Sequence, residues 1–239
     1  MKLNKKKIRI IIATLFVAII TAAVLCYVFI FRVPSANEIF KNSINSIVEL
    51  KVSDETTTAY GTAVFINNDG TLVSNAHLVS YKKNGVYQEF KTFEIRFSYE
   101  NDYHEVSLIK YDLDEDISFL KFGNNENNIS YSSIKTSNSD SLSYGNTVYA
   151  IGNALNHGLS ITKGIISIPT INIEYNDYTR KVIQCDLMIN EGNSGGALLN
   201  EKGDLIGITT FRLKDSSYNV IYGMAFAIPI NTVLSYLDA

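Results

Sequence analysis

Ser194 lies in a glycine-rich stretch, EGNSGGALL (191–199), that could form the turn of a catalytic nucleophile. Residues 192–196 fit the pattern G-x-S-x-G, which in α/β-hydrolases places a serine on a sharp turn between a strand and a helix. The same residues also suit the serine of a triad whose histidine and aspartate come earlier in the chain. Gly, Asn and Ser are ordinary turn residues as well, so a purely structural turn is the third alternative.

The positions of the histidines separate the two catalytic patterns. In α/β-hydrolases the catalytic histidine follows the serine. Here His77, His104 and His157 all precede Ser194, and no histidine follows it. The hydrolase pattern is therefore excluded, and two alternatives remain: a triad in the order His, Asp, Ser, or a purely structural turn. His104 and His157 lie among polar residues and are interpreted as surface side chains.

His77 and Asp116 are the expected partners of Ser194. His77 follows an apolar strand in GTLVSNAHLVS (70–80), and Asp116 directly precedes the apolar segment ISFLKF (117–122). Strand ends hold side chains rigidly, and a buried aspartate can fix the tautomer of the imidazole that deprotonates the serine. The sequence thus predicts that these three residues meet at one site.

The turn around Ser194 is expected to stabilise the negative charge that develops on the substrate oxygen. The backbone of Gly192, Asn193 and Ser194 would form this oxyanion hole, with the N–H groups of Gly192 and Ser194 as donors. Glycine at position 192 permits the unusual backbone conformation that such a turn needs.

Beyond residue 45 the apolar residues recur with a period of two, which is typical of β-strands with one buried face. The expected strands are Ser46–Val52, Gly61–Ile66, Thr71–Ser74, Thr92–Phe97, Val106–Tyr111, Ile117–Phe122, Thr147–Ile151, Gly164–Ile173, Thr179–Cys185, Asp204–Phe211 and Val220–Ile228. Short helices are predicted at Glu38–Ile47 and Ile230–Leu237, and residues 123–140 are expected to connect two halves. The pattern predicts an all-β domain, either a barrel or a sandwich.

A membrane anchor is expected at the N-terminus. Residues 1–9 are rich in lysine and arginine, and residues 10–31 carry no charge. An apolar run of this length can cross a hydrocarbon core of roughly 30 Å at about 1.5 Å per residue. A secretory signal peptide is the alternative, but its apolar region is usually shorter and ends in small residues. The basic flank is predicted to stay in the cytoplasm, which places the following domain outside a bacterial plasma membrane.

The rest of the chain is acidic and poor in cysteine. Residues 33–239 contain 15 of the 21 Lys and Arg residues and all 24 Asp and Glu residues, so their formal net charge is −9. This balance argues against nucleic acid as a partner. Cys26 lies in the apolar run and Cys185 in the distal domain, so no internal disulfide is expected, and no His/Cys cluster suggests a metal site. Neither a metal nor a cofactor is predicted.

Taken together, these segments resemble the protease domain of the HtrA/Deg family, within the chymotrypsin-like (trypsin-like) serine peptidases. The matching segments occur in the family's order and span residues 69–231: DGTLVSNAHLV, YDLDEDISFLKF, YAIGNALNHGLSITKGIIS, INEGNSGGALLNEKGDLIGITT and YGMAFAIPIN. The resemblance implies two six-stranded antiparallel β-barrels with a C-terminal helix over residues 46–239, after a linker and short helix at 32–45. It places the triad in the cleft between the barrels. It also implies an ATP-independent endopeptidase that acts on unfolded or misfolded exported polypeptides.

The resemblance further implies where substrate specificity would be determined. Met188 and Ile189 would form the base of the pocket for the side chain that precedes the cleaved bond, with Ile208 and Thr209 also lining it. None of these residues is charged, so an aliphatic substrate side chain is expected. Glu191 departs from the family, in which proline or a similar residue is more usual at this position.

Other departures concern regulation. The chain ends soon after the helix at 230–237, so the C-terminal PDZ domains that are usual in the family are expected to be absent, and assembly into a homo-oligomer is left open. Asn193 stands where animal trypsin-like enzymes have an aspartate that pairs with a newly formed N-terminus, so no zymogen activation is expected. The alternative function is a protease-fold protein that binds exported polypeptides without cleaving them.

Overall fold

The computed structural model describes residues 4–30, 32–123, 129–175, 178–214 and 220–238. The chain divides into two compact units, Met1–Pro34 and Ser35–Ala239. Each unit is considered by itself.

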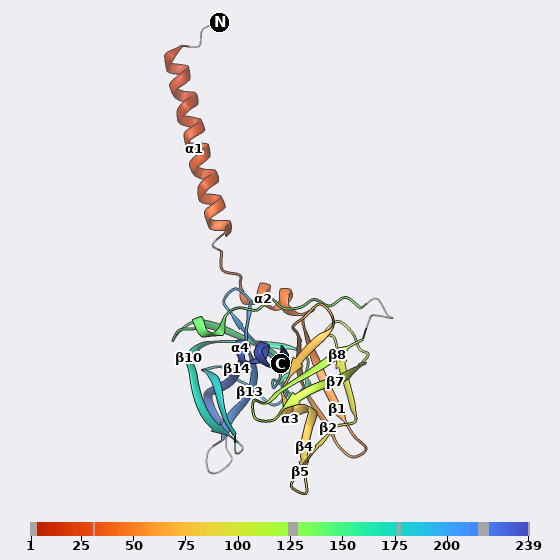
Figure 1. Ribbon diagram of the computed structural model, residues 1–239. Coiled ribbons are helices and arrows are strands. Elements are labelled where there is room, and N and C mark those ends of the chain that lie inside the picture. Colours follow the sequence, from red (N-terminus) through yellow and green to blue (C-terminus); the bar gives the residue numbers. More distant parts are fainter. Residues whose placement is uncertain (1–3, 31, 124–128, 176–177, 215–219, 239) are drawn as a thin grey trace. The chain divides into compact units, whose positions relative to one another are not determined.

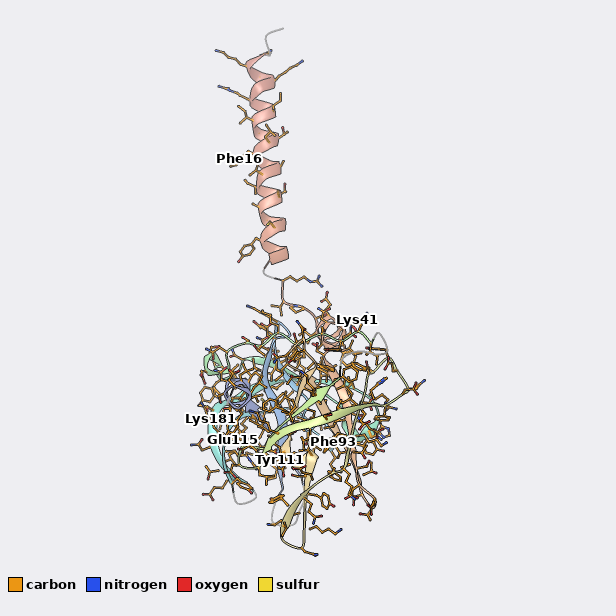
Figure 2. All side chains as sticks on the ribbon, turned by 45° about the vertical axis from the view of Figure 1, so that its right-hand side comes forward. Phe16, Lys41, Phe93, Tyr111, Glu115 and Lys181 are labelled. Atoms are coloured by element: carbon orange, nitrogen blue, oxygen red, sulfur yellow. The ribbon has the colours of Figure 1, made fainter. Side chains whose placement is uncertain are left out.

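The first unit consists of α1 (Lys5–Ile30), a helix of 26 residues. Its described side chains are exposed and project from all sides of the helix, as Phe16 does in Figure 2. The segment Lys5–Val24 has a mean hydropathy of 2.2 and is long and apolar enough to cross a membrane, although a signal sequence would have the same properties. The helix begins inside the basic segment that was expected to precede it, because lysine is a good helix former.

The second unit begins with α2 (Ala36–Ser43), which starts and ends earlier than the helix predicted at Glu38–Ile47. A capping box sets its start: the Ser35 hydroxyl accepts from the N–H of Glu38, and the Glu38 carboxylate accepts from the N–H of Ser35. These two bonds satisfy N–H groups that a helix terminus leaves free. Ile39 faces the core and is 1% exposed.

Two closed antiparallel barrels of six strands each follow, as the resemblance implied. The first consists of β1 (Ile47–Ser53), β2 (Thr58–Phe65), β3 (Thr71–Ser74), β8 (Ile117–Phe122), β7 (His104–Asp112) and β6 (Thr92–Arg96), in spatial order. The second consists of β10 (Ser160–Tyr175), β11 (Tyr178–Cys185), β14 (Val220–Pro229), β13 (Leu205–Lys214), β12 (Ala197–Asn200) and β9 (Thr147–Gly152). Figure 1 shows the two sets of strands side by side, with α4 (Ile230–Leu237) ending the chain.

Three strands were not predicted. β12 has only four residues, directly after the glycine-rich turn. β4 (Ser80–Lys83) and β5 (Val86–Glu89) form a separate two-stranded hairpin next to α3 (Ala76–Val79). The hairpin turns at Asn84 and Gly85, both of which have positive φ.

Buried residues of both barrels form one continuous hydrophobic cluster. Val73 and Phe119 of the first barrel belong to it, as do Ile151, Ala197 and Ile208 of the second. All five are at most 2% exposed. Burying these apolar surfaces together favours docking of the two barrels, which brings the ends of β3, β8 and β12 to a common region.

Candidate active site

Strand pairing brings His77 and Asp116 together. β3 and β8 are antiparallel, with Ser74 opposite Ser118. His77 lies in α3, just after β3 ends, and Asp116 lies just before β8 begins. The Nδ1 atom of His77 is 2.9 Å from Oδ2 and 3.0 Å from Oδ1 of Asp116. The register of one strand pair therefore sets this contact.

Asn75, which is fully buried, holds the two chain segments at this point. Its side-chain amide donates to the main-chain oxygen of Asp116 at 3.0 Å, and its own main-chain oxygen accepts from the Ser118 hydroxyl at 3.0 Å. Asp116 has a φ of 60°, a conformation that is uncommon for a residue other than glycine. The bonds at Asn75 and Ser118 help to maintain it.

The carboxylate of Asp116 is surrounded by donors. Besides the imidazole, the main-chain N–H of His77 donates to Oδ1 at 3.0 Å, and the Thr210 hydroxyl donates to Oδ2 at 2.5 Å. Burial raises the pKa of Asp116, but the charge of His77 and the hydrogen bonds from His77 and Thr210 lower it by more, so it lies below its usual value. Asp116 is therefore an anion that accepts the Nδ1 hydrogen of His77.

The pKa of the His77 imidazole is shifted in the opposite direction, upward. Loss of solvent lowers its pKa, but the charge and hydrogen bond of Asp116 raise it by more, and the net pKa lies above the usual value of 6.5. Because Nδ1 is bound to the carboxylate, Nε2 is the nitrogen that can accept a proton. The His77 side chain is 46% exposed, so a substrate can reach it.

Ser194 lies in the turn before β12 and lines the same cavity as His77 and Asp116. The cavity has a volume of about 420 Å³. The Ser194 hydroxyl donates to the main-chain oxygen of Thr210 at 2.8 Å. Thr210 of β13 therefore contacts both Asp116 and Ser194, one through its hydroxyl and the other through its backbone.

Thr62 of β2, which is fully buried, holds the turn around Ser194 from the other barrel. Its N–H donates to the main-chain oxygen of Ser194 at 2.9 Å, and its hydroxyl donates to the main-chain oxygen of Gly192 at 2.8 Å. The Thr62 hydroxyl in turn accepts from the N–H of Asn153 at 2.9 Å. The nucleophile turn of the second barrel is thus fixed by a residue of the first. The sequence did not identify Thr62.

The backbone of residues 192–194 was expected to form an oxyanion hole, and its conformation is described by one torsion angle and three N–H groups. Gly192 has a φ of 92°, and a Cβ there would collide with the oxygen of Asn153. Among the described residues, the N–H groups of Gly192 and Ser194 have no protein acceptor. The N–H of Asn193 instead donates to the Asn190 oxygen at 3.1 Å. The N–H groups of Gly192 and Ser194, which were the expected donors, thus remain available to a substrate oxygen.

The four residues expected to form the specificity pocket lie in different surroundings. Ile189 lines the cavity, but Met188, Ile208 and Thr209 do not. The Met188 side chain is 61% exposed, and Ile208 is fully buried in the core shared by the barrels. The Thr209 hydroxyl donates to the main-chain oxygen of Asn193 at 2.5 Å. A resemblance between sequences gives the order of residues along the chain but not the direction in which each side chain points.

The remaining walls of the cavity come from segments that sequence analysis did not assign to the site. Several of these residues are on the β4–β5 hairpin or on β11 and β13: Tyr81, Lys82, Tyr87, Tyr178, Arg180 and Phe211. Arg180 donates from Nε to the oxygen of Asp114 at 2.7 Å and from Nη2 to the oxygen of Leu113 at 2.6 Å. It thereby connects the second barrel to the loop that precedes Asp116.

Comparisons with known proteins identify the family of the chain. Residues 61–208 match the family model for the trypsin-like peptidase domain. The chain is 39% identical over 181 residues to a probable periplasmic serine endoprotease DegP-like of Buchnera aphidicola subsp. Baizongia pistaciae, covering 73% of this chain and 35% of that protein. It is 33% identical over 191 residues to the serine endoprotease DegS of Haemophilus influenzae, covering 79% and 51%. The solved HtrA-type protease AlgW with a tripeptide superimposes with a TM-score of 0.73 at 27% identity, covering 86% of this chain and 63% of that one.

The chain spans about a third to a half of the length of these two curated relatives. The matched residues include His77, Asp116 and Ser194, and the two-barrel fold agrees with the solved structure. The chain therefore belongs to the trypsin-like peptidase family, and its relatives include the HtrA-type serine proteases.

Proposed function

We propose that this chain is a serine endopeptidase in which Ser194 is the nucleophile and His77 is the general base. The observation that carries the proposal is the contact between Nδ1 of His77 and the buried carboxylate of Asp116, in a cavity that Ser194 also lines. In this role Asp116 holds the hydrogen of the neutral imidazole on Nδ1, which leaves Nε2 free to accept a proton, and it stabilises the imidazolium that forms during attack.

The reaction follows from these positions. The Ser194 oxygen bonds to the carbonyl carbon of the substrate while its proton passes to Nε2 of His77. The N–H groups of Gly192 and Ser194 stabilise the negative oxygen of the tetrahedral intermediate. The carbon–nitrogen bond then breaks as His77 protonates the leaving amine. Water attacks the resulting acyl-enzyme with His77 as base, which releases the acid and restores Ser194.

The proposed substrates are exported polypeptides in unfolded or misfolded states. Support comes from relatives that are described as periplasmic serine endoproteases. We further propose that α1 anchors the chain in a bacterial plasma membrane. Its lysine-rich start would lie in the cytoplasm, and Ser35–Ala239 would lie on the outer face.

Labelling with a fluorophosphonate probe tests the catalytic proposal. Wild-type protein should be labelled and should cleave casein, and Ser194→Ala should do neither. Ser80→Ala is a matched control, because Ser80 lines the same cavity and donates to the Ala76 oxygen at 2.9 Å. Loss of labelling in both variants, or no labelling of the wild type, would contradict the proposal. Binding of unfolded casein without cleavage would favour a role in holding polypeptides.

Membrane anchoring requires a separate test. The full chain should remain in the membrane fraction after carbonate extraction, and a protease added outside intact cells should degrade Ser35–Ala239. A mature form that lacks the α1 residues would show that the segment is a cleaved signal sequence instead.

A further inference from the structure

The direction of the Gly192 N–H is determined at the preceding carbonyl. A peptide group is planar and trans, so its C=O and N–H point in opposite directions. The main-chain oxygen of Glu191 accepts a hydrogen bond of 2.7 Å from the N–H of Leu155. The N–H of Gly192, which belongs to the same peptide group, is therefore directed away from Leu155. Loss of this bond would let the peptide rotate and present its oxygen where the N–H now points.

The turn that presents the Leu155 N–H has an unfavourable backbone conformation. Leu155 and Asn156 have φ values of 55° and 57°, in the left-handed region that residues with a Cβ rarely adopt. The side chain of Asn153, which is fully buried, braces this turn. Its Oδ1 accepts from the N–H of Gly158 at 2.9 Å, and its Nδ2 donates to Oδ1 of Asn156 at 3.3 Å. The conformation at Leu155 thus depends on how the Asn153 amide is oriented.

Glu49 of the first barrel fixes that orientation. Its Oε2 accepts from Nδ2 of Asn153 at 3.0 Å and from Nη2 of Arg96 at 2.7 Å. A carboxylate can only accept hydrogen bonds, so it binds the NH₂ end of the amide and rejects the oxygen end. Glu49 is 3% exposed, and its charge is compensated by Arg96, which lies directly opposite on β6. An apolar side chain at position 49 could not select between the two ends of the amide.

We infer that Glu49 is a positioning residue for the oxyanion hole. Its carboxylate orients Asn153, and Asn153 maintains the turn at Leu155. The Leu155 N–H then holds the peptide that directs the Gly192 N–H toward the substrate. The catalytic consequence rests on the proposed peptidase function, whereas the connection from Glu49 to Leu155 does not.

The neighbouring ion pair on the same two strands provides a matched control. Lys51 of β1 lies directly opposite Glu94 of β6, two residues along from the pair of Glu49 and Arg96. The Lys51 ammonium is 2.7 Å from the Glu94 carboxylate. Glu94→Met therefore removes a carboxylate from this strand pair without removing a contact to Asn153. Glu49→Met removes the carboxylate that accepts from Asn153.

The test combines hydrogen exchange with kinetics on the full chain in detergent. Exchange at residues 153–158, followed by mass spectrometry, should be at least tenfold faster in Glu49→Met than in the wild type and unchanged in Glu94→Met. In peptide cleavage, kcat of Glu49→Met should fall at least tenfold with little change in KM, because the oxyanion forms only after substrate binds. Glu49→Gln keeps one acceptor oxygen and should recover part of both effects, and it serves as the test variant if Glu49→Met does not fold.

Three results would overturn the inference. The first is unchanged exchange at 153–158 in a folded Glu49 variant. The second is that exchange at 153–158 becomes faster by the same factor in Glu94→Met as in Glu49→Met. The third is a rise in the KM of Glu49→Met that accounts for its loss of activity. Exchange is measured without substrate, so the link remains testable even if the wild type cleaves nothing. A wild type that cleaves nothing would refute the proposed function but not the connection from Glu49 to Leu155.

Discussion

The hydroxyl of Ser194 donates a hydrogen bond of 2.8 Å to the main-chain oxygen of Thr210. A hydroxyl has a single hydrogen, so Ser194 cannot donate to Nε2 of His77 at the same time. In the proposed mechanism, the Ser194 side chain therefore rotates from Thr210 to His77 before it attacks. Rotation about one side-chain bond between staggered positions is fast and needs no movement of the backbone.

Asp116→Asn should nearly abolish turnover while leaving the fold intact. The amide keeps the size of the side chain but removes the charge that holds the His77 tautomer, and a loss of about 10⁴-fold in kcat is expected. The measurement is steady-state cleavage of a peptide, with circular dichroism to verify folding. A loss of less than tenfold in kcat would show that Asp116 does not act on His77 as proposed.

The pH dependence of kcat/KM should have its acid limb above pH 6.5. His77 must be neutral to accept the proton of Ser194, and Asp116 raises the His77 pKa above its usual 6.5. Activity should therefore increase as the pH rises through this higher pKa. The profile should be measured with a peptide that has no ionisable side chain, so that only the enzyme titrates. An acid limb at or below pH 6 would contradict the pKa direction.

Thr210→Val should destabilise the protein. It removes the donor that lies 2.5 Å from Oδ2 of Asp116, at a site that is 2% exposed. Hydrogen bonds to buried charged groups are worth about 1.5–3 kcal/mol, and the free energy of unfolding in urea should fall by that amount. Thr210→Ser keeps the hydroxyl and is the control. Equal stabilities of the two variants would show that the bond contributes nothing.

Gly192→Ala should lose activity as well as stability. Its φ of 92° is unfavourable for alanine, and the added Cβ would collide with the oxygen of Asn153. Displacing one oxyanion donor costs about 10²–10³-fold in kcat. Gly145→Ala is the matched control, because Gly145 also has a positive φ, of 79°, but no atom lies within 4 Å of the added Cβ. Gly145→Ala should therefore cost about 1–2 kcal/mol of stability and leave kcat unchanged.

Cleavage should occur preferentially after Val, Ala and similar side chains. Ile189 lines the cavity beside Ser194 and supplies an apolar surface there. Digestion of a peptide library, followed by mass spectrometry of the products, would measure this preference. Efficient cleavage after Lys or Arg, with none after aliphatic residues, would be inconsistent with it.

Much of the fold could be predicted because the barrel strands are rich in β-branched and aromatic residues and are separated by turn residues, even where nearly every position is buried, as in β1 and β8. β12 was missed because its four residues, ALLN, include no β-branched or aromatic side chain. The β4–β5 hairpin was missed because its strands are largely polar, although the Asn84–Gly85 pair at its turn is a strong hairpin signal. β5 is exposed along its whole length, so burial imposes no pattern on it.

The site was predictable to a lesser extent. The order of His77, Asp116 and Ser194 along the chain was informative, since each borders a recognisable strand or turn. Thr62 and Thr210 were not predicted because both act through partners that strand pairing and barrel docking bring near, and no local pattern marks them. The orientation of Met188 likewise depends on tertiary packing, and no local pattern in the sequence indicates that this residue is exposed.

The bonds from Thr62 to the turn at Ser194 have a consequence for folding. Thr62 is in the first barrel, and the turn it holds is in the second, whose strands β13 and β14 follow that turn in the chain. A chain whose second barrel had not yet docked against the first would lack these two bonds to the nucleophile turn. In the proposed function, we therefore expect proteolytic activity to appear only once both barrels have folded and docked.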